Sequence, residues 1–162
     1  MSEKKRTARQ LILLGLVVAC AVVFTTGMFL PWLTWPGKNV NTGQIVPLGV
    51  PLFESDYTIM SNIANTFPIN AVRFCALLCA LACGGNAFLI IFGVVDMYQP
   101  EKGIKYFWSI ATIVAGLALA GLSITYLLVF NANTTTVLTL NYGFIAIPFG
   151  TICSGICLLL YR

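Results

Sequence analysis

Residues 106–161 read YFWSIATIVAGLALAGLSITYLLVFNANTTTVLTLNYGFIAIPFGTICSGICLLLY and contain no charged side chain. A helix that crosses the hydrocarbon core of a bilayer needs about 20 apolar residues, so this stretch has roughly the length of two crossings. A polar cluster at residues 131–136, NANTTT, divides the stretch and is typical of a turn. The stretch therefore predicts two membrane-spanning helices, one on each side of this cluster.

Two further uncharged stretches precede this one, at residues 10–30 and 74–95. The whole chain is 59% hydrophobic and 9% charged, whereas an ordinary soluble domain has about 25% charged residues. Backbone polar groups in lipid must be paired inside their own segment, which favours helices over open strands. The 162 residues are therefore interpreted as one domain of an all-α integral membrane protein. The predicted four-helix bundle has helices over about residues 10–31, 69–97, 105–130 and 140–161.

Basic residues are divided unevenly between the two sides of this four-span arrangement. Because cytoplasmic segments carry an excess of lysine and arginine, both termini are predicted to be cytoplasmic, in a multi-pass protein of the plasma membrane. The net charge of +4 then reflects topology, and no nucleic-acid partner is expected. A contact of residues 4–9 with phospholipid headgroups of the bilayer stays open. Of the nine basic residues, the cytoplasmic side has Lys4, Lys5, Arg6, Arg9, Lys102, Lys105 and Arg162, and the outer side has Lys38 and Arg73.

The two segments on the outer side are residues 33–68 and 131–139. The first has many apolar side chains and a turn-forming sequence, NVNTG, at residues 39–43, with β-forming residues on both sides. This pattern predicts a small hairpin, in which Pro47 and Pro51 confine their strand to an edge of the sheet. Ser55 and Asp56 are suited to cap a short helix after the hairpin. The first outer loop is therefore predicted to be partly ordered.

Aromatic side chains are the main candidates for structural or interaction roles in this loop. Trp32 and Trp35 follow the first predicted helix, where they fit the interfacial aromatic belt of membrane proteins. A loop without a disulfide must be held by burial, and one buried aromatic side chain contributes roughly 1.5–3 kcal/mol. The available anchors are Trp32, Trp35, Leu48, Leu52 and Phe53.

Two polar side chains of the second predicted helix complete the candidate residues. Arg73 lies near the outer end, where it can extend to lipid headgroups or donate to carbonyl groups of the loop. Asn86 lies near the middle and is predicted to bond across to another helix, which is worth around 1 kcal/mol or less. A role for Asn86 in a transport path is the alternative.

All six cysteines lie in predicted helices, and none forms a Cys-x-x-Cys pair. Cysteine is a small apolar packing residue in helix interfaces, and this is the interpretation that we favour. A soft-metal site shared by the second and fourth helices is the alternative, because thiols four residues apart share a helix face. The chain has no histidine and no phosphate-binding loop or Gly-x-Ser-x-Gly motif. We therefore expect no enzyme activity, catalytic residue, cofactor or metal.

Three short stretches, PW at residues 31–32, NAVRF at residues 70–74 and NYGF at residues 141–144, carry a resemblance to a known family. They resemble motifs of the claudin and peripheral myelin protein superfamily. Residues 31–32, Pro-Trp, resemble that family's Pro-x-Trp after the first helix, and residues 70–74, NAVRF, resemble its Ala-x-Arg-Ala at the start of the second. Residues 141–144, NYGF, are similar to the start of its fourth helix. The family's Gly-Leu-Trp with two loop cysteines is missing, so its disulfide cannot form. The resemblance implies a small sheet on the bundle, with lateral assembly or association with larger membrane proteins.

The function that these features favour is protein–protein contact without catalysis. We expect an adhesion protein, a scaffold or an accessory subunit of a membrane complex, bound to other membrane proteins or to further copies of itself. Small residues on the helix faces favour close packing and lateral assembly. The alternative is an oligomeric channel or small transporter with its pore between copies. A membrane thiol or metal enzyme is a third possibility.

Overall fold

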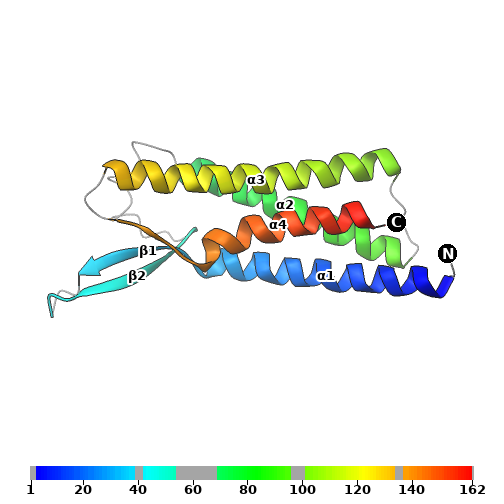
Figure 1. The fold of residues 1–162 in the computed structure, drawn as a ribbon, viewed down its shortest axis with the longest axis horizontal. Coiled ribbons are helices and arrows are strands. Elements are labelled where there is room, and N and C mark those ends of the chain that lie inside the picture. The colour runs from blue at the N-terminus through cyan, green and yellow to red at the C-terminus, as the bar shows by residue number, and fades with distance from the viewer. Residues whose placement is uncertain (1–2, 39–41, 54–68, 96–100, 134–136, 162) are drawn as a thin grey trace.

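The computed structural model describes residues 3–38, 42–53, 69–95, 101–133 and 137–161. Its helices are α1 (Glu3–Phe29), α2 (Ile69–Val94), α3 (Lys102–Asn133) and α4 (Tyr142–Leu160). The helices form an elongated bundle (Figure 1). The start of α1 and the end of α4 lie at one end of it, which we call the termini end. The strands lie at the opposite end, which we call the sheet end (Figure 1).

Each of the four helices is long and apolar enough to cross a membrane. The shortest, α4, has 19 residues and therefore a length of about 28 Å, close to the thickness of the hydrocarbon core. The prediction of four spanning-length helices is confirmed, with shifted ends. The helix α1 begins at Glu3 rather than near residue 10, and α4 begins at Tyr142 because the side chain of Asn141 caps it.

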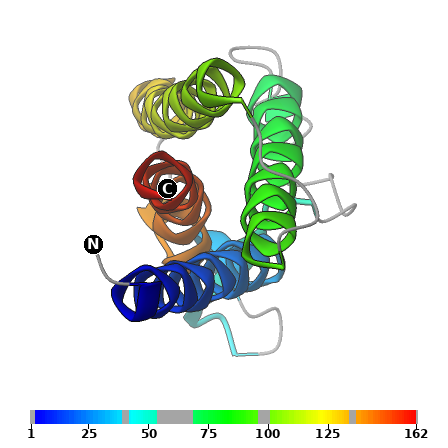
Figure 2. The same ribbon diagram turned by 90° about the vertical axis from the view of Figure 1, so that its right-hand side faces the viewer.

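The helix α4 is the central element of the bundle. It packs against α1, α2 and α3, and it lies between α1 and α3 in the view along the bundle (Figure 2). Eleven of its 19 residues are buried, against eight of 26 in α2. Small residues make this close packing possible, since a Cβ atom at Gly150 would lie 3.0 Å from the carbonyl oxygen of Cys20 in α1.

The strands at the sheet end are β1 (Pro31–Lys38), β2 (Ile45–Pro51) and β3 (Thr139–Leu140). They form one antiparallel sheet in the order β2-β1-β3. The predicted hairpin is confirmed, with Gly43 in the left-handed conformation (φ 69°) between its strands. The strand β2 lies at an edge of the sheet, as its prolines predict.

Two features of the predicted outer segments differ from the structure or lie outside it. Residues 139–140 were assigned to the second loop and to the start of the fourth helix. That assignment is wrong, because they pair as β3 with Leu33 and Thr34 of β1. The short helix predicted after Ser55 falls within residues 54–68, which lie outside the described residues.

Candidate interaction surface at the sheet end

The sheet is attached to the bundle by the first residues of β1. Trp32 is 2% exposed and Leu33 is 0% exposed, although neighbouring residues of a regular strand point to opposite faces. The pairing of β1 with β2 shifts register between Pro31 and Leu33, and such an irregularity bends the strand and changes the direction of its side chains. Both side chains therefore enter the hydrophobic core.

The indole of Trp32 is surrounded by aromatic rings from two helices. It stacks on Phe144 of α4, with ring centroids 5.8 Å apart, and lies 5.5 Å from the ring of Tyr126 in α3. Tyr126 in turn contacts the ring of Phe130. The structure thus places Trp32 inside the protein rather than in an interfacial belt, where it joins β1 to α3 and α4.

The end of β2 is joined to α2 by a buried side chain and one hydrogen bond. Leu52, directly after β2, is 1% exposed and belongs to the same core as Trp32. The half-buried Arg73 donates from Nε to the carbonyl oxygen of Leu52 at 2.7 Å. Hydrogen bonds from a charged donor are stronger than neutral ones, so Arg73 is well suited to hold this end of the loop. Of the two contacts considered for Arg73, the structure shows the one to a loop carbonyl.

Two asparagines outside the predicted site residues, Asn131 and Asn141, hold β3 in place. The amide group of Asn131 pairs with the backbone of Leu138, with 2.8 Å from Leu138 N to Oδ1 and 3.2 Å from Nδ2 to Leu138 O. Asn141 accepts from the backbone N–H of Tyr142, donates from Nδ2 to Thr34 Oγ1 at 2.8 Å, and donates from its backbone to Trp32 O. An asparagine directly before an apolar run is a helix-capping signal, by which Asn141 could have been recognised.

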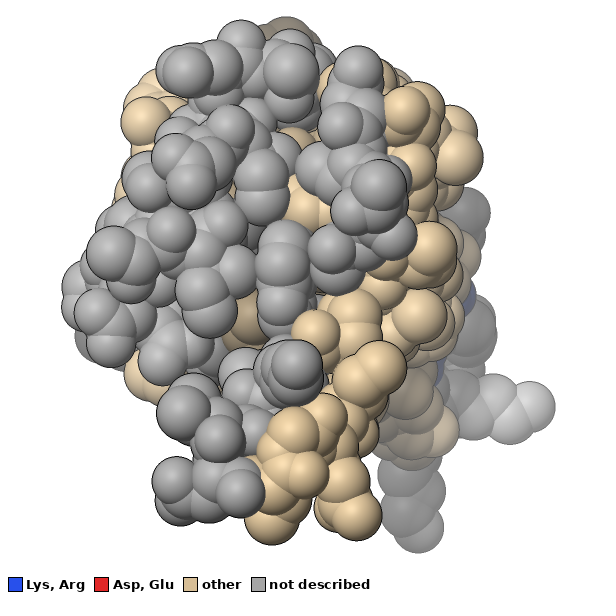
Figure 3. Space-filling model, turned by 90° about the vertical axis from the view of Figure 1, so that its left-hand side faces the viewer, with Lys and Arg blue, Asp and Glu red and all other residues tan. Residues whose placement is uncertain are grey.

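The outer surface of the sheet presents apolar side chains. Ile45 is 75% exposed and Val137 is 60% exposed, and Pro36 and Pro47 are exposed beside them. We call these four residues the sheet patch. With Thr34 and Thr139 they line a groove of about 160 Å³. Figure 3 shows this end of the molecule, where the described atoms nearest the viewer belong to uncharged residues.

Three of the five predicted loop anchors have no buried side chain among the described residues. Phe53 is 38% exposed, so it is not one of the buried anchors. The side chains of Trp35 and Leu48 lie outside the described residues, although their backbones are paired in the hairpin. The other two predicted anchors, Trp32 and Leu52, are buried, and Leu33 and Leu138 add two buried side chains that were not predicted.

Asn86 lies in the interior of the bundle, apart from the sheet patch. It is fully buried and donates from Nδ2 to Ser154 Oγ of α4 at 2.8 Å. Among the described residues, no donor reaches its Oδ1 atom. The predicted bond across helices is therefore present, between α2 and α4.

The cysteines of α2 and α4 have different neighbours among the described residues. Cys79 and Cys83 of α2 lie within hydrogen-bonding reach of Thr151, whereas Cys157 of α4 lies against Cys20 of α1. All six thiols are unpaired by disulfides. In the part of the chain that the structure describes, no three His, Cys, Asp or Glu residues gather where they could hold a metal ion. A metal site between the second and fourth helices is therefore not assembled from these cysteines.

These observations define the class of structure, a bundle of four helices with the length and composition of membrane spans and a small antiparallel sheet on one end. Comparisons with protein-family models, with curated proteins and with solved structures find no match to this chain. The resemblance to the claudin and peripheral myelin protein superfamily stays a prediction from sequence.

Proposed function

We propose that this chain is a multi-pass protein of the plasma membrane that acts by protein–protein contact through the sheet patch. Both termini lie in the cytoplasm in this proposal, and the sheet end lies outside the cell. The partner is another membrane protein or a further copy of the chain. The role is that of an adhesion protein, a scaffold or an accessory subunit, as in the claudin-like proteins that the sequence resembles.

The observation that carries the proposal is an exposed apolar patch on a firmly supported sheet. Ile45 and Val137 extend from the sheet with 75% and 60% of their surface exposed. Contiguous exposed apolar surface on a folded protein marks an interaction site, because leaving it in water is unfavourable. The core contacts of Trp32 and the hydrogen bond from Arg73 to Leu52 hold the sheet in place. A pre-ordered surface of this kind loses little conformational entropy on binding.

An oligomeric channel or small transporter remains the second hypothesis, and no specific observation favours it. The buried hydroxyl groups of Ser109, Thr112 and Thr151 donate to carbonyl groups one turn earlier in their own helices, at 2.8, 2.9 and 2.8 Å. Hydroxyls bonded in this way are satisfied within the helix. Solute flux through pure protein in liposomes would contradict the contact hypothesis and support the channel.

We expect labelling experiments to place the sheet end outside the cell and the termini end inside it. The variant Gln44→Cys introduces a thiol at an exposed position of the hairpin. The matched variant Glu101→Cys introduces one at an exposed position beside the start of α3. An impermeant maleimide added to intact cells should label the first variant and spare the second until the cells are permeabilised. The reason is the excess of basic residues at the termini end. The reverse labelling pattern would overturn the proposed orientation.

The double variant Ile45→Asp/Val137→Asp is expected to lose its partner while keeping its fold. Burying one large apolar side chain contributes roughly 1.5–3 kcal/mol, so removing two should lower the yield of partner by about ten-fold or more. The measurement is quantitative mass spectrometry of proteins captured with the tagged chain after cross-linking in native membranes. Further copies of the chain count as a partner.

The control for this variant is Gln44→Asp, which adds a charge next to Ile45 without removing an apolar side chain. It should capture the partner as the wild type does, and both variants should keep the wild-type unfolding temperature in detergent. Equal capture by the double variant and the wild type would show that the sheet patch is not the contact surface.

A further inference from the structure

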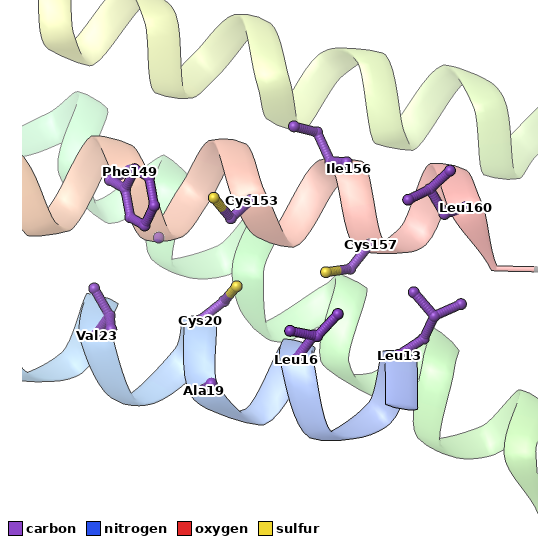
Figure 4. A pocket seen from close by; sticks show the side chains of 11 residues that line it. Leu13, Leu16, Ala19, Cys20, Val23, Phe149, Cys153, Ile156, Cys157 and Leu160 are labelled. Carbon is purple, nitrogen blue, oxygen red and sulfur yellow. The ribbon is translucent and has the colours of Figure 1, made fainter. Parts of the chain in front are cut away.

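We propose that a groove between α1 and α4 binds an acyl chain of an anionic phospholipid, with the phosphate of the headgroup held by Arg9. The inference rests on the membrane location proposed above and concerns a different surface from the sheet patch. The groove lies on the outside of the bundle and has a volume of about 380 Å³. Figure 4 shows its two walls, with Leu13, Cys20 and Val23 on α1 opposite Phe149 and Cys157 on α4.

The groove has the chemistry and shape of a hydrocarbon site. Its lining consists of aliphatic, aromatic, glycine and cysteine residues. The small side chain of Ala19, which is exposed, leaves it open, since a larger side chain there would fill the space. The larger side chains at its borders, Leu16, Phe149 and Ile156, are 49%, 58% and 40% exposed and form its rims. An apolar groove of this kind between two membrane helices can hold a flexible acyl chain, because no polar group of the lining lies against the acyl chain.

The depth of the groove matches a single leaflet. From Leu13 to Val23 the helix α1 rises by about 15 Å, which is half of the roughly 30 Å hydrocarbon core. On α4 the groove runs from Phe149 to Leu160, the part of that helix nearest the termini end. The acyl chain of one lipid reaches through about half of the hydrocarbon core, which is the length that the groove offers.

A positive charge stands at the end of the groove where a headgroup would lie. Arg9 precedes Leu13 by four residues, and the spacing 9, 13, 16, 20, 23 places it on the same face of α1 as the groove. Its Nη2 atom donates to the carbonyl oxygen of Leu160, which itself lines the groove, at 3.1 Å.

A guanidinium group has five N–H donors, and its planar fork fits a phosphate. Among the described residues the hydrogen-bond acceptor of Arg9 is Leu160 O, so donors remain for a headgroup. The two turns of α1 before Arg9 contain Lys4, Lys5 and Arg6, which add positive charge at the same end. This charge favours an anionic phospholipid over a neutral one.

The test is native mass spectrometry of the purified protein in detergent, titrated with phosphatidylglycerol or with phosphatidylcholine of the same acyl chains. Both lipids have a phosphate, but only phosphatidylglycerol carries a net negative charge, so we expect one phosphatidylglycerol to bind about ten-fold more tightly than phosphatidylcholine beside these basic residues. Arg9→Gln should reduce this preference and keep the weaker binding of both lipids. Ala19→Phe should fill the groove and lower the binding of both lipids by about ten-fold.

The matched control for the groove variant is Ala118→Phe, on an exposed part of α3 outside the groove. It should bind both lipids as the wild type does. Ala19 is exposed as well, so both variants should keep the wild-type unfolding temperature in lipid-free detergent. Equal phosphatidylglycerol binding by Ala19→Phe and wild type would overturn the inference. It would also be overturned if Ala19→Phe converted a dimer into a monomer in light scattering, since a second copy would then cover the groove.

The lipid inference and the proposed function fail in different measurements. Extraction of the chain from membranes by alkaline carbonate would contradict the membrane location itself. The sheet patch lies at the other end of the molecule. Ala19→Phe should therefore capture the partner as the wild type does, whereas the sheet-patch variant should not.

Discussion

Replacing Trp32 with alanine should lower the free energy of unfolding by about 3–5 kcal/mol, the usual cost of removing a buried large aromatic side chain. The indole is 2% exposed and contacts the rings of Tyr126 and Phe144, so its removal leaves a cavity where β1, α3 and α4 meet. The measurement is denaturant or thermal unfolding in detergent. Protease cleavage within residues 42–53 should also become faster, because this cavity removes the main attachment of the sheet.

Trp108→Ala is the matched control, since it removes the same side chain from a site that is 37% exposed. We expect a smaller loss of stability there and no change in cleavage of residues 42–53. If the two tryptophan variants lost equal stability and the hairpin stayed equally resistant to protease, the sheet would not depend on Trp32. The four helices should still insert in both variants, because insertion depends on the apolar length of each helix.

The variants Gly143→Ala and Gly121→Ala should change stability in opposite directions. A Cβ atom at Gly143 would lie 2.6 Å from the carbonyl oxygen of Gly27 and 3.0 Å from that of Leu30. Both are backbone atoms, so the start of α4 would have to move away from the end of α1, and such overpacking costs about 1–3 kcal/mol. A Cβ atom at Gly121 would have no neighbour within 4 Å. Alanine there should be neutral or stabilising by up to about 1 kcal/mol, because it is the better helix former.

Both glycine variants can be compared with the wild type by thermal unfolding in the same detergent. A decrease in unfolding temperature for Gly143→Ala with no decrease for Gly121→Ala is the expected result. Equal decreases would show that the backbone contact between α1 and α4 contributes nothing specific. The position of Gly143 also matters for the sheet, since the same Cβ atom would lie 3.1 Å from the carbonyl oxygen of Pro31, the first residue of β1.

The contacts within the candidate surface could be predicted only in part, for physical reasons. Arg73 was placed correctly beside the loop because its height along α2 follows from counting residues. Its acceptor, Leu52 O, was not predictable, because the choice between a lipid headgroup and a carbonyl depends on where the loop folds. The strand β3 was missed because two residues carry no alternation pattern, and their pairing with β1 exists only once α3 and α4 bring residues 137–141 to the sheet.

The cysteines show the same limit inside the bundle. The cysteines of α2 and those of α4 are spaced by four residues, which places them on one face of their helix. This can be read directly from the sequence. It does not state which helix that face meets. In the tertiary structure Cys157 lies against Cys20 of α1, and Cys79 and Cys83 lie near the hydroxyl group of Thr151. The same arrangement places Cys20, Cys153 and Cys157 along the groove between α1 and α4.

The amino-acid sequence by itself determined the four spanning-length helices, their order and a hairpin around the turn at residues 39–43. These features depend on the apolar length of a segment and on local turn chemistry, which are properties of neighbouring residues. The tertiary structure alone decided that α4 is the central helix, that Trp32 and Leu33 are both buried, that β3 completes the sheet and that Asn86 bonds to Ser154. Those features depend on which faces of distant segments meet, and nearly every face of these helices is apolar enough to meet any other.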